Sequence, residues 1–133
     1  MKHIYTVFLL YFIINPMYAQ KQIGTKLIDS VSAYICEVNI KHPEIVMRQA
    51  IFETGWFKSD FLMKKNNLFG FRVKNYMQFD SWKESVDYYK KWQSKYYIEE
   101  KYKDYYDFLT KIKYGNKRYV QYLKSLKHNL SCD

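Results

Sequence analysis

The most constraining feature of this chain is a pair of short segments in its first half. Residues 49–56 read QAIFETGW, and residues 66–71 read NNLFGF. The first segment suits the end of a helix, on which Val46, Ala50 and Glu53 share one face because of the helical repeat. That face is otherwise apolar, so Glu53 interrupts a stripe of side chains that we expect to be buried.

The expected surroundings of Glu53 favour its protonated form. Burial removes water from a carboxylate, and the last turn of a helix carries the negative end of the helix dipole. Both effects raise the pKa of the carboxyl group. A carboxyl group that is still protonated near neutral pH can donate its proton to a glycosidic oxygen. The alternative is an ordinary helix-end glutamate that is held in an ion pair.

Together, the two segments resemble the bacterial glucosaminidase domain of glycoside hydrolase family 73. That family reads roughly Q-A-x-x-E-[ST]-G-W and then N-N-L-F-G, and two motifs in the right order are more specific than either alone. The resemblance covers about residues 43–126 and is strongest up to Phe71. It implies a mainly α, α+β, lysozyme-like fold, with five or six helices and a small β-hairpin lobe beside a cleft.

The same resemblance implies the activity. The family hydrolyses peptidoglycan glycan strands after N-acetylglucosamine, as an endo-β-N-acetylglucosaminidase, and its motif glutamate is the general acid. Carried over to this chain, that role falls to Glu53. Two rival functions remain open at this point: a cell-wall amidase, and a catalytically silent module that only binds the wall.

A second catalytic group is expected at Tyr114. The family reads roughly Y-A-x-D-P-x-Y here, whereas residues 114–119 read YGNKRY, which is one residue shorter and lacks Asp-Pro. Tyr119 is the alternative, although its place on an apolar helical stripe also fits core packing. Glycosidases usually use two carboxylates, but no spacing singles out a second acid. Assistance by the acetamido group of the substrate is a further route.

Four side chains are expected to contact the substrate: Trp56, Asn67, Phe69 and Tyr119. Trp56 follows the catalytic segment directly and could form a wall of the sugar site. An asparagine amide such as that of Asn67 can bind an acetamido group or a sugar hydroxyl, although asparagines more often hold turns. Phe69 suits either the core or the floor of the cleft. Asn66 and Phe57 are expected to be structural.

The first residues of the chain are typical of an export signal. Lys2 and His3 precede an apolar run that is too short to span a bilayer, which needs about 20 residues. Pro16 and the segment Met17-Tyr18-Ala19 then offer a cleavage site before Gln20, although the residue three before the cut is Met rather than a small residue. We therefore expect residues 1–19 to be a signal peptide and residues 20–133 to be the glucosaminidase-like domain. The expected location is the periplasm or the outside of a bacterium, without stable membrane insertion. The alternative is a membrane anchor.

The net charge and the cysteines say less about the function than the two motifs do. The 133-residue chain has a formal net charge of +9, which favours anionic partners in general. Aromatic and basic residues alternate in the second half, but no RNA-binding motif accompanies them, so we expect no nucleic-acid partner.

Cys36 and Cys132 can pair or remain free thiols. No zinc spacing is present, so no metal or cofactor is expected, and we expect a monomer.

The periodicity of the sequence predicts the elements of the fold. Pro43 suits the start of the second helix, and Gly55 suits its end. Lys74 and Asn75 would form the turn of the hairpin, and Ser81 begins a capping box. The expected elements are helices at residues 22–39, 43–54, 59–65, 81–94 and 102–112, a hairpin at 68–79, and a last helix that is capped by Asn116.

Overall fold

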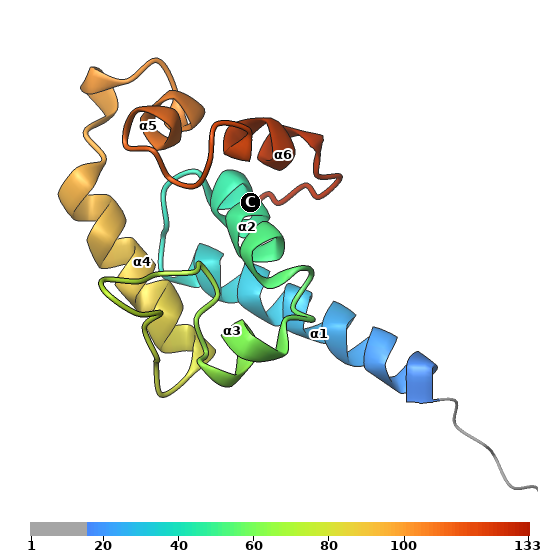
Figure 1. The fold of residues 1–133 in the computed structure, drawn as a ribbon. Coiled ribbons are helices and arrows are strands. Elements are labelled where there is room, and N and C mark those ends of the chain that lie inside the picture. The colour runs from blue at the N-terminus through green and yellow to red at the C-terminus, as the bar shows by residue number, and fades with distance from the viewer. Residues whose placement is uncertain (1–15) are drawn as a thin grey trace, which may run out of the picture.

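The computed structural model describes residues 16–133, so most of the expected signal peptide lies outside the described residues. Within this part of the chain the fold is mainly helical, as predicted (Figure 1). No helix between residues 16 and 133 is both long enough and apolar enough to cross a membrane. The elements are α1 (Pro16–Glu37), α2 (Pro43–Thr54), α3 (Asp60–Lys64), α4 (Trp82–Tyr96), the short 3-10 helix η1 (Glu99–Lys101), α5 (Tyr105–Lys111) and α6 (Tyr119–Ser125).

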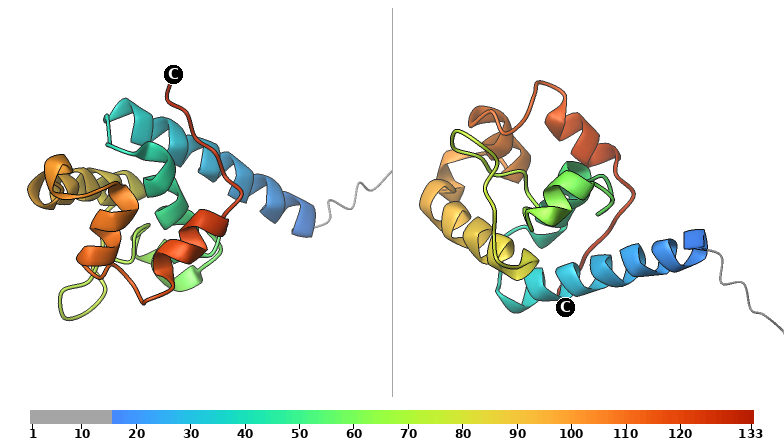
Figure 2. Two further views of the ribbon diagram at one scale, coloured as in Figure 1. Left: turned by 90° about the horizontal axis from the view of Figure 1, so that it is seen from above. Right: turned by 60° about the horizontal axis from the view of Figure 1, so that its bottom comes forward.

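Helix α2 lies at the centre of the molecule, with α1 and α6 packed against it (Figures 1 and 2). Its buried residues are Val46, Met47, Gln49, Ala50, Ile51 and Thr54. Helix α4 lies along another side of the bundle, and the six α-helices of residues 16–133 contribute to one apolar core or pack against it. Because the central helix carries the first motif, the core fixes the position of Glu53.

The end of α2 is a left-handed turn. Gly55 ends the helix with φ of 56°, as predicted, and Trp56 and Phe57 continue with φ of 60° and 59°. The side chain of Thr54 holds this turn, since its Oγ1 accepts a hydrogen bond from the Phe57 amide at 2.9 Å. The turn sends Phe57 into the core, as predicted, and leaves Trp56 39% exposed.

The prediction of a β-hairpin at residues 68–79 was wrong, because the segment forms no pair of regular strands. In the described chain, this segment is a loop with a single antiparallel bridge between Arg72 and Tyr76. The loop is held by the Asn67 side chain, which donates to the carbonyl oxygens of Phe71 and Met77 and accepts from the Phe71 amide. A side chain therefore supplies part of the hydrogen bonding that a longer β-ladder would have supplied, beside the backbone bond from the Met77 amide to the Phe71 carbonyl.

Other predicted boundaries are close to the observed ones. Ser59 and Ser81 cap α3 and α4, as predicted. The first helix begins at Pro16, earlier than predicted. Lys113, with φ of 56°, forms the left-handed position that follows α5. The prediction that Asn116 caps the last helix was wrong: α6 follows Arg118 at its N-cap, without a side-chain capping bond, and Asn116 Oδ1 instead accepts from the Arg118 amide at 2.8 Å.

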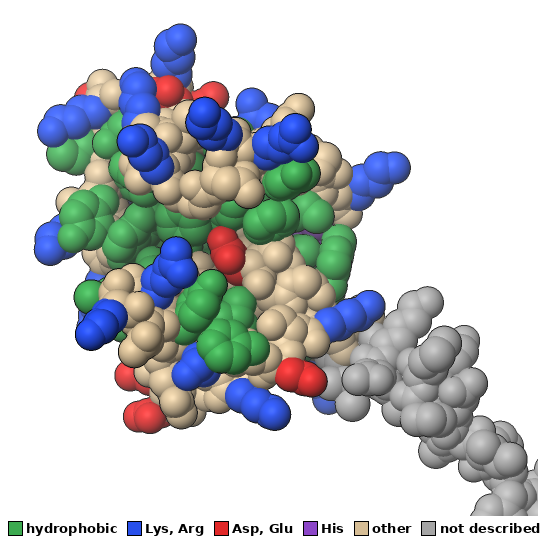
Figure 3. Space-filling view, in the orientation of Figure 1, with side chains coloured by type: hydrophobic (Ala, Val, Ile, Leu, Met, Phe, Trp, Pro, Cys, Tyr) green, Lys and Arg blue, Asp and Glu red, His purple; other side chains and the backbone are tan. Residues whose placement is uncertain are grey.

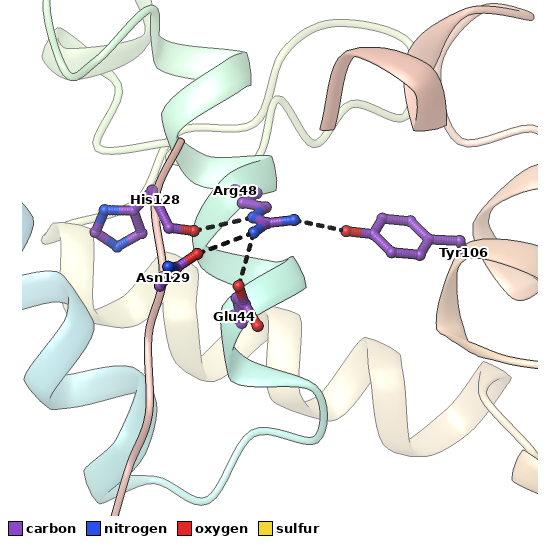
Figure 4. Close-up of polar contacts among 5 residues, drawn as sticks. All are labelled: Glu44, Arg48, Tyr106, His128 and Asn129. Carbon is purple, nitrogen blue, oxygen red and sulfur yellow. Dashed lines mark hydrogen bonds and ion pairs between the residues drawn. The ribbon is translucent and has the colours of Figure 1, made fainter. Parts of the chain in front are cut away.

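The C-terminal segment runs back from α6 to α1, where a disulfide joins Cys36 to Cys132 (Figure 2). The sequence alone had left this pairing open. Arg48 of α2 fastens the same segment: its guanidinium donates to the His128 carbonyl at 3.0 Å and lies 3.4 Å from Asn129 Oδ1 (Figure 4). The disulfide and the arginine thus hold the chain end across two helices.

Candidate active site

Glu53 occupies the last turn of α2 and is partly buried. Burial raises the pKa of its carboxyl group, and a hydrogen bond from the Tyr119 hydroxyl opposes that rise. In the part of the chain that the structure describes, Glu53 takes part in no ion pair. The helix-end ion pair that was the alternative for Glu53 is therefore not formed.

The carboxyl group of Glu53 rests on Gly70. A Cβ atom placed on Gly70 would lie 2.7 Å from Glu53 Oε2, which is closer than such contacts occur. Gly70 also has φ of +65°, a backbone conformation that glycine adopts readily. The second motif thus forms the surface on which the catalytic candidate of the first motif lies. Sequence reasoning had assigned Gly70 no role, although the glycine of N-N-L-F-G was the available signal.

Tyr119, the first residue of α6, lies beside Glu53 and is only 2% exposed. Burial raises the pKa of its hydroxyl well above the usual value, and the neighbouring Tyr114 and Glu53 add to the rise. The Gln49 amide, which is also buried, donates to the Tyr119 oxygen at 3.4 Å. Gln49 is a second residue whose place at the site was not predicted.

Tyr114 lies in the turn between α5 and α6, and its ring is 5.3 Å from that of Tyr119. Its hydroxyl donates to the carbonyl oxygen of Phe69 at 2.7 Å. Burial raises the pKa of this hydroxyl well above the usual value, and the charge of Glu53 raises it further. The structure therefore brings both candidate tyrosines near Glu53, and it ties Tyr114 to the backbone of the second motif.

The predicted substrate contacts fall in different places. Asn67 is 0% exposed, and its amide is fully used within its own loop, so its placement argues against a direct contact with substrate. Phe69 is 1% exposed and packs on Tyr89 with ring centroids 4.5 Å apart, which makes it a core residue. Of the four predicted contacts, Trp56 has the exposed ring.

Exposed aromatic residues lie next to Glu53 in the sequence and on the neighbouring helix. Phe52 of α2 and Tyr122 of α6 stack with an interplanar angle of 15° and a centroid distance of 5.6 Å. On the face drawn in Figure 3, hydrophobic side chains form a band across the middle, one acidic side chain lies within it, and Lys and Arg side chains lie on either side. An apolar band with few polar groups is typical of a ligand-binding face.

Residues 16–133 contain no group of His, Cys, Asp or Glu side chains arranged to hold a metal ion. The open hollow along α4 is lined by Asp87, Lys90, Lys91, Ser94 and Lys95, and so includes none of the motif residues. The chemistry that the arrangement around Glu53 can supply is proton donation from a carboxyl group, with two tyrosine hydroxyls nearby.

Comparison with known proteins identifies the family. No curated protein and no solved structure matches the chain. A family model described as glucosaminidase, mannosyl-glycoprotein endo-beta-N-acetylglucosaminidase, matches residues 29–131. The matched region contains Glu53, Gly70, Tyr114 and Tyr119, and it spans most of the chain. The protein therefore belongs to the glucosaminidase family of glycoside hydrolases.

Proposed function

We propose that the protein is an exported peptidoglycan hydrolase that cuts glycan strands after N-acetylglucosamine, with Glu53 as the general acid. The observation that carries this proposal is the position of Glu53, which is partly buried on Gly70, free of ion pairs in the described chain, and has a raised pKa. A carboxyl group in such a place can hold its proton until it meets a glycosidic oxygen. The family match supports the same chemistry.

In the proposed reaction, the carboxyl proton of Glu53 passes to the glycosidic oxygen as the bond from that oxygen to the anomeric carbon breaks. The leaving strand takes the bonding electrons and the proton, and the sugar left behind develops oxocarbenium character. Water then adds to the anomeric carbon, and the proton that it loses restores the protonated form of Glu53. Tyr114, Tyr119 or the acetamido group of the substrate stabilises the positive charge in this scheme, since the described site offers no second carboxylate beside Glu53.

We also propose that sugar rings bind along the exposed aromatic residues beside Glu53. Trp56 is the predicted contact with a suitably exposed ring. Phe52 and Tyr122, which are 36% and 40% exposed, extend the apolar surface toward α6. Flat aromatic rings offer large contact areas to the apolar faces of sugars at low cost in conformational entropy.

Export is part of the proposal. The disulfide between Cys36 and Cys132 supports it, because such bonds persist in oxidising compartments such as the periplasm and the cell exterior. In this proposal residues 1–19 act as a signal peptide, and residues 20–133 act as a monomeric enzyme. The high net positive charge suits an anionic wall.

Mass spectrometry of fragments released from purified wall tests the proposed bond. The proposal predicts new reducing ends that carry N-acetylglucosamine. New reducing ends on N-acetylmuramic acid would contradict the bond, and free stem peptides would indicate an amidase. Binding to the wall without release of any fragment, by protein that is folded and disulfide-bonded, would indicate a binding module and would contradict the enzymatic proposal.

A further inference from the structure

A chain of buried hydrogen bonds leads from the backbone of Lys41 to the first motif. Gln93 Oε1 accepts from the Lys41 amide at 2.9 Å, and Gln93 Nε2 donates to the Lys41 carbonyl at 2.8 Å and to the Tyr105 oxygen at 3.0 Å. The hydroxyls of Tyr105 and Tyr89 are 2.6 Å apart, and Tyr89 donates to Gln49 Oε1. The four side chains come from α2, α4 and α5, and all four are buried.

The direction of this series of hydrogen bonds is fixed at Lys41, the end that lies farthest from Glu53. A backbone N–H can only donate and a backbone C=O can only accept, so Lys41 determines which way the Gln93 amide faces. Gln93 must then donate to the Tyr105 oxygen. In the described part of the chain, Tyr89 is the acceptor left for the Tyr105 hydroxyl hydrogen. Tyr89 in turn uses its own hydrogen on Gln49 Oε1.

This direction continues to Glu53. Because Gln49 Oε1 is occupied by Tyr89, its Nε2 faces the Tyr119 oxygen and donates to it. The Tyr119 hydroxyl hydrogen is then free to point at the Glu53 carboxyl group. The opposite direction would make Gln49 accept from Tyr119, and it would leave the Tyr105 hydroxyl hydrogen buried without an acceptor, which is costly.

We propose that Gln49 is a positioning residue for the reaction: its amide turns the Tyr119 hydroxyl toward Glu53, and the buried chain from Lys41 fixes that direction. The inference rests on the proposed role of Glu53 as general acid. A hydrogen bond from Tyr119 stabilises the Glu53 carboxylate that forms as the proton leaves, so it lowers the barrier for proton donation. The glutamine of Q-A-x-x-E thereby acquires a specific role through Tyr119.

The groups around Glu53 are consistent with this role. Tyr119 of α6 and Tyr114 of the preceding turn are the titratable groups whose interaction with Glu53 the structure shows, and Gly70 brings no side chain. Neither tyrosine is charged at neutral pH, since burial raises the pKa of both hydroxyls well above the usual value. The hydrogen bond from Tyr119 lowers the pKa of Glu53 against the larger effect of burial.

The test compares Gln49→Met, Tyr119→Phe and the double variant. The first readout is the titration of the Glu53 carboxyl carbon by NMR, and the second is the alkaline limb of the pH profile of kcat/KM. Each single substitution is expected to move the Glu53 titration and the alkaline limb to higher pH, and to lower kcat by about threefold to tenfold. If Gln49 acts through Tyr119, the double variant shifts no further than Tyr119→Phe alone.

Two further variants separate positioning from loss of stability. Val31→Ala removes buried volume from α1, and α1 contributes no side chain to the hydrogen bonds that run from Lys41 to Gln49. This variant should therefore lower Tm without moving the Glu53 titration. Tyr89→Phe keeps the ring but removes the hydrogen bond to Gln49 Oε1. The Gln49 amide is then free to turn, so the pKa of Glu53 should rise although neither Gln49 nor Tyr119 has been changed. This variant also decides the question if Gln49→Met fails to fold.

Independent and additive shifts in the double variant would overturn the proposal. So would an unchanged Glu53 titration in both Gln49→Met and Tyr89→Phe. If the wild-type protein releases no wall fragments, the proposed function fails, whereas the NMR titration still decides whether Gln49 directs the Tyr119 hydroxyl.

Discussion

The carboxyl group of Glu53 occupies the space that a side chain on Gly70 would need, with 2.7 Å between Glu53 Oε2 and the position of a Cβ atom on Gly70. Two motifs that are separate in the sequence therefore form one site. The glycine serves two purposes, because its backbone is left-handed and its missing side chain makes room for the carboxyl group.

Substitution Gly70→Ala should reduce wall hydrolysis far more than it reduces stability. The added methyl group collides with the Glu53 carboxyl group, and a shift of the general acid by about 1 Å can lower the rate about a hundredfold. Gly55→Ala is the matched control: Gly55 has φ of +56°, but a Cβ atom added to it would meet no heavy atom within 4 Å. Both variants bear similar backbone strain, of about 1–2 kcal/mol. Equal activity in the two variants would contradict the account.

The raised pKa of Glu53 predicts a pH-dependent cost to stability. Burial raises the folded-state pKa above the reference value of 4.5, so the folded protein binds this proton more tightly than the unfolded chain. The resulting stabilisation is complete below the unfolded-state pKa and is lost as pH rises through the folded-state pKa. The advantage in Tm of Glu53→Gln over wild type should therefore grow between about pH 4 and pH 7. Thermal unfolding at both pH values checks this, and a constant difference would contradict it.

Loss of the disulfide should destabilise the fold without removing the site. Cys36 and Cys132 are 96 residues apart in the sequence, and breaking such a link typically costs about 2–5 kcal/mol. Urea unfolding with and without a reductant measures the free energy of unfolding. The variant that carries both Cys36→Ser and Cys132→Ser should match the reduced protein and should not respond to the reductant.

Arg48→Lys should weaken the attachment of the C-terminal segment. The guanidinium holds Glu44, Tyr106 and the His128 carbonyl at once, and a lysine ammonium lacks this planar arrangement of donors (Figure 4). We expect a loss of about 1–3 kcal/mol in the free energy of unfolding. Arg72→Lys, at an exposed position, is the control and should stay within about 0.5 kcal/mol of wild type. Equal losses in the two variants would show that the network contributes little.

The helices were predictable because the signals for them are local. Pro43, Gly55, Ser59 and Ser81 act through their own backbone conformation or through capping bonds within a few residues, and the structure confirms each. The detail of the hairpin was not predictable, because many of the hydrogen bonds that hold its loop come from the buried amide of Asn67. Alternation of apolar and polar residues cannot reveal such a side-chain partner.

The site was only partly predictable for a similar reason. The position of Glu53 on the buried side of α2 followed from helical periodicity, and the family followed from the two motifs. The contact with Gly70 and the hydrogen bond from Gln49 to Tyr119 join residues that are distant in sequence. Such contacts depend on the packing of α2 against the loop and α6, which no local pattern encodes.

The most direct test of the account is the rate at which Glu53→Gln releases reducing ends from purified peptidoglycan, compared with wild type. Glutamine keeps the shape of the side chain but has no acidic proton to donate, so we expect a loss of at least about a hundredfold in kcat. The stability measurements above show whether the variant is folded. Release of reducing ends at the wild-type rate by folded Glu53→Gln would contradict the assignment of Glu53 as the general acid.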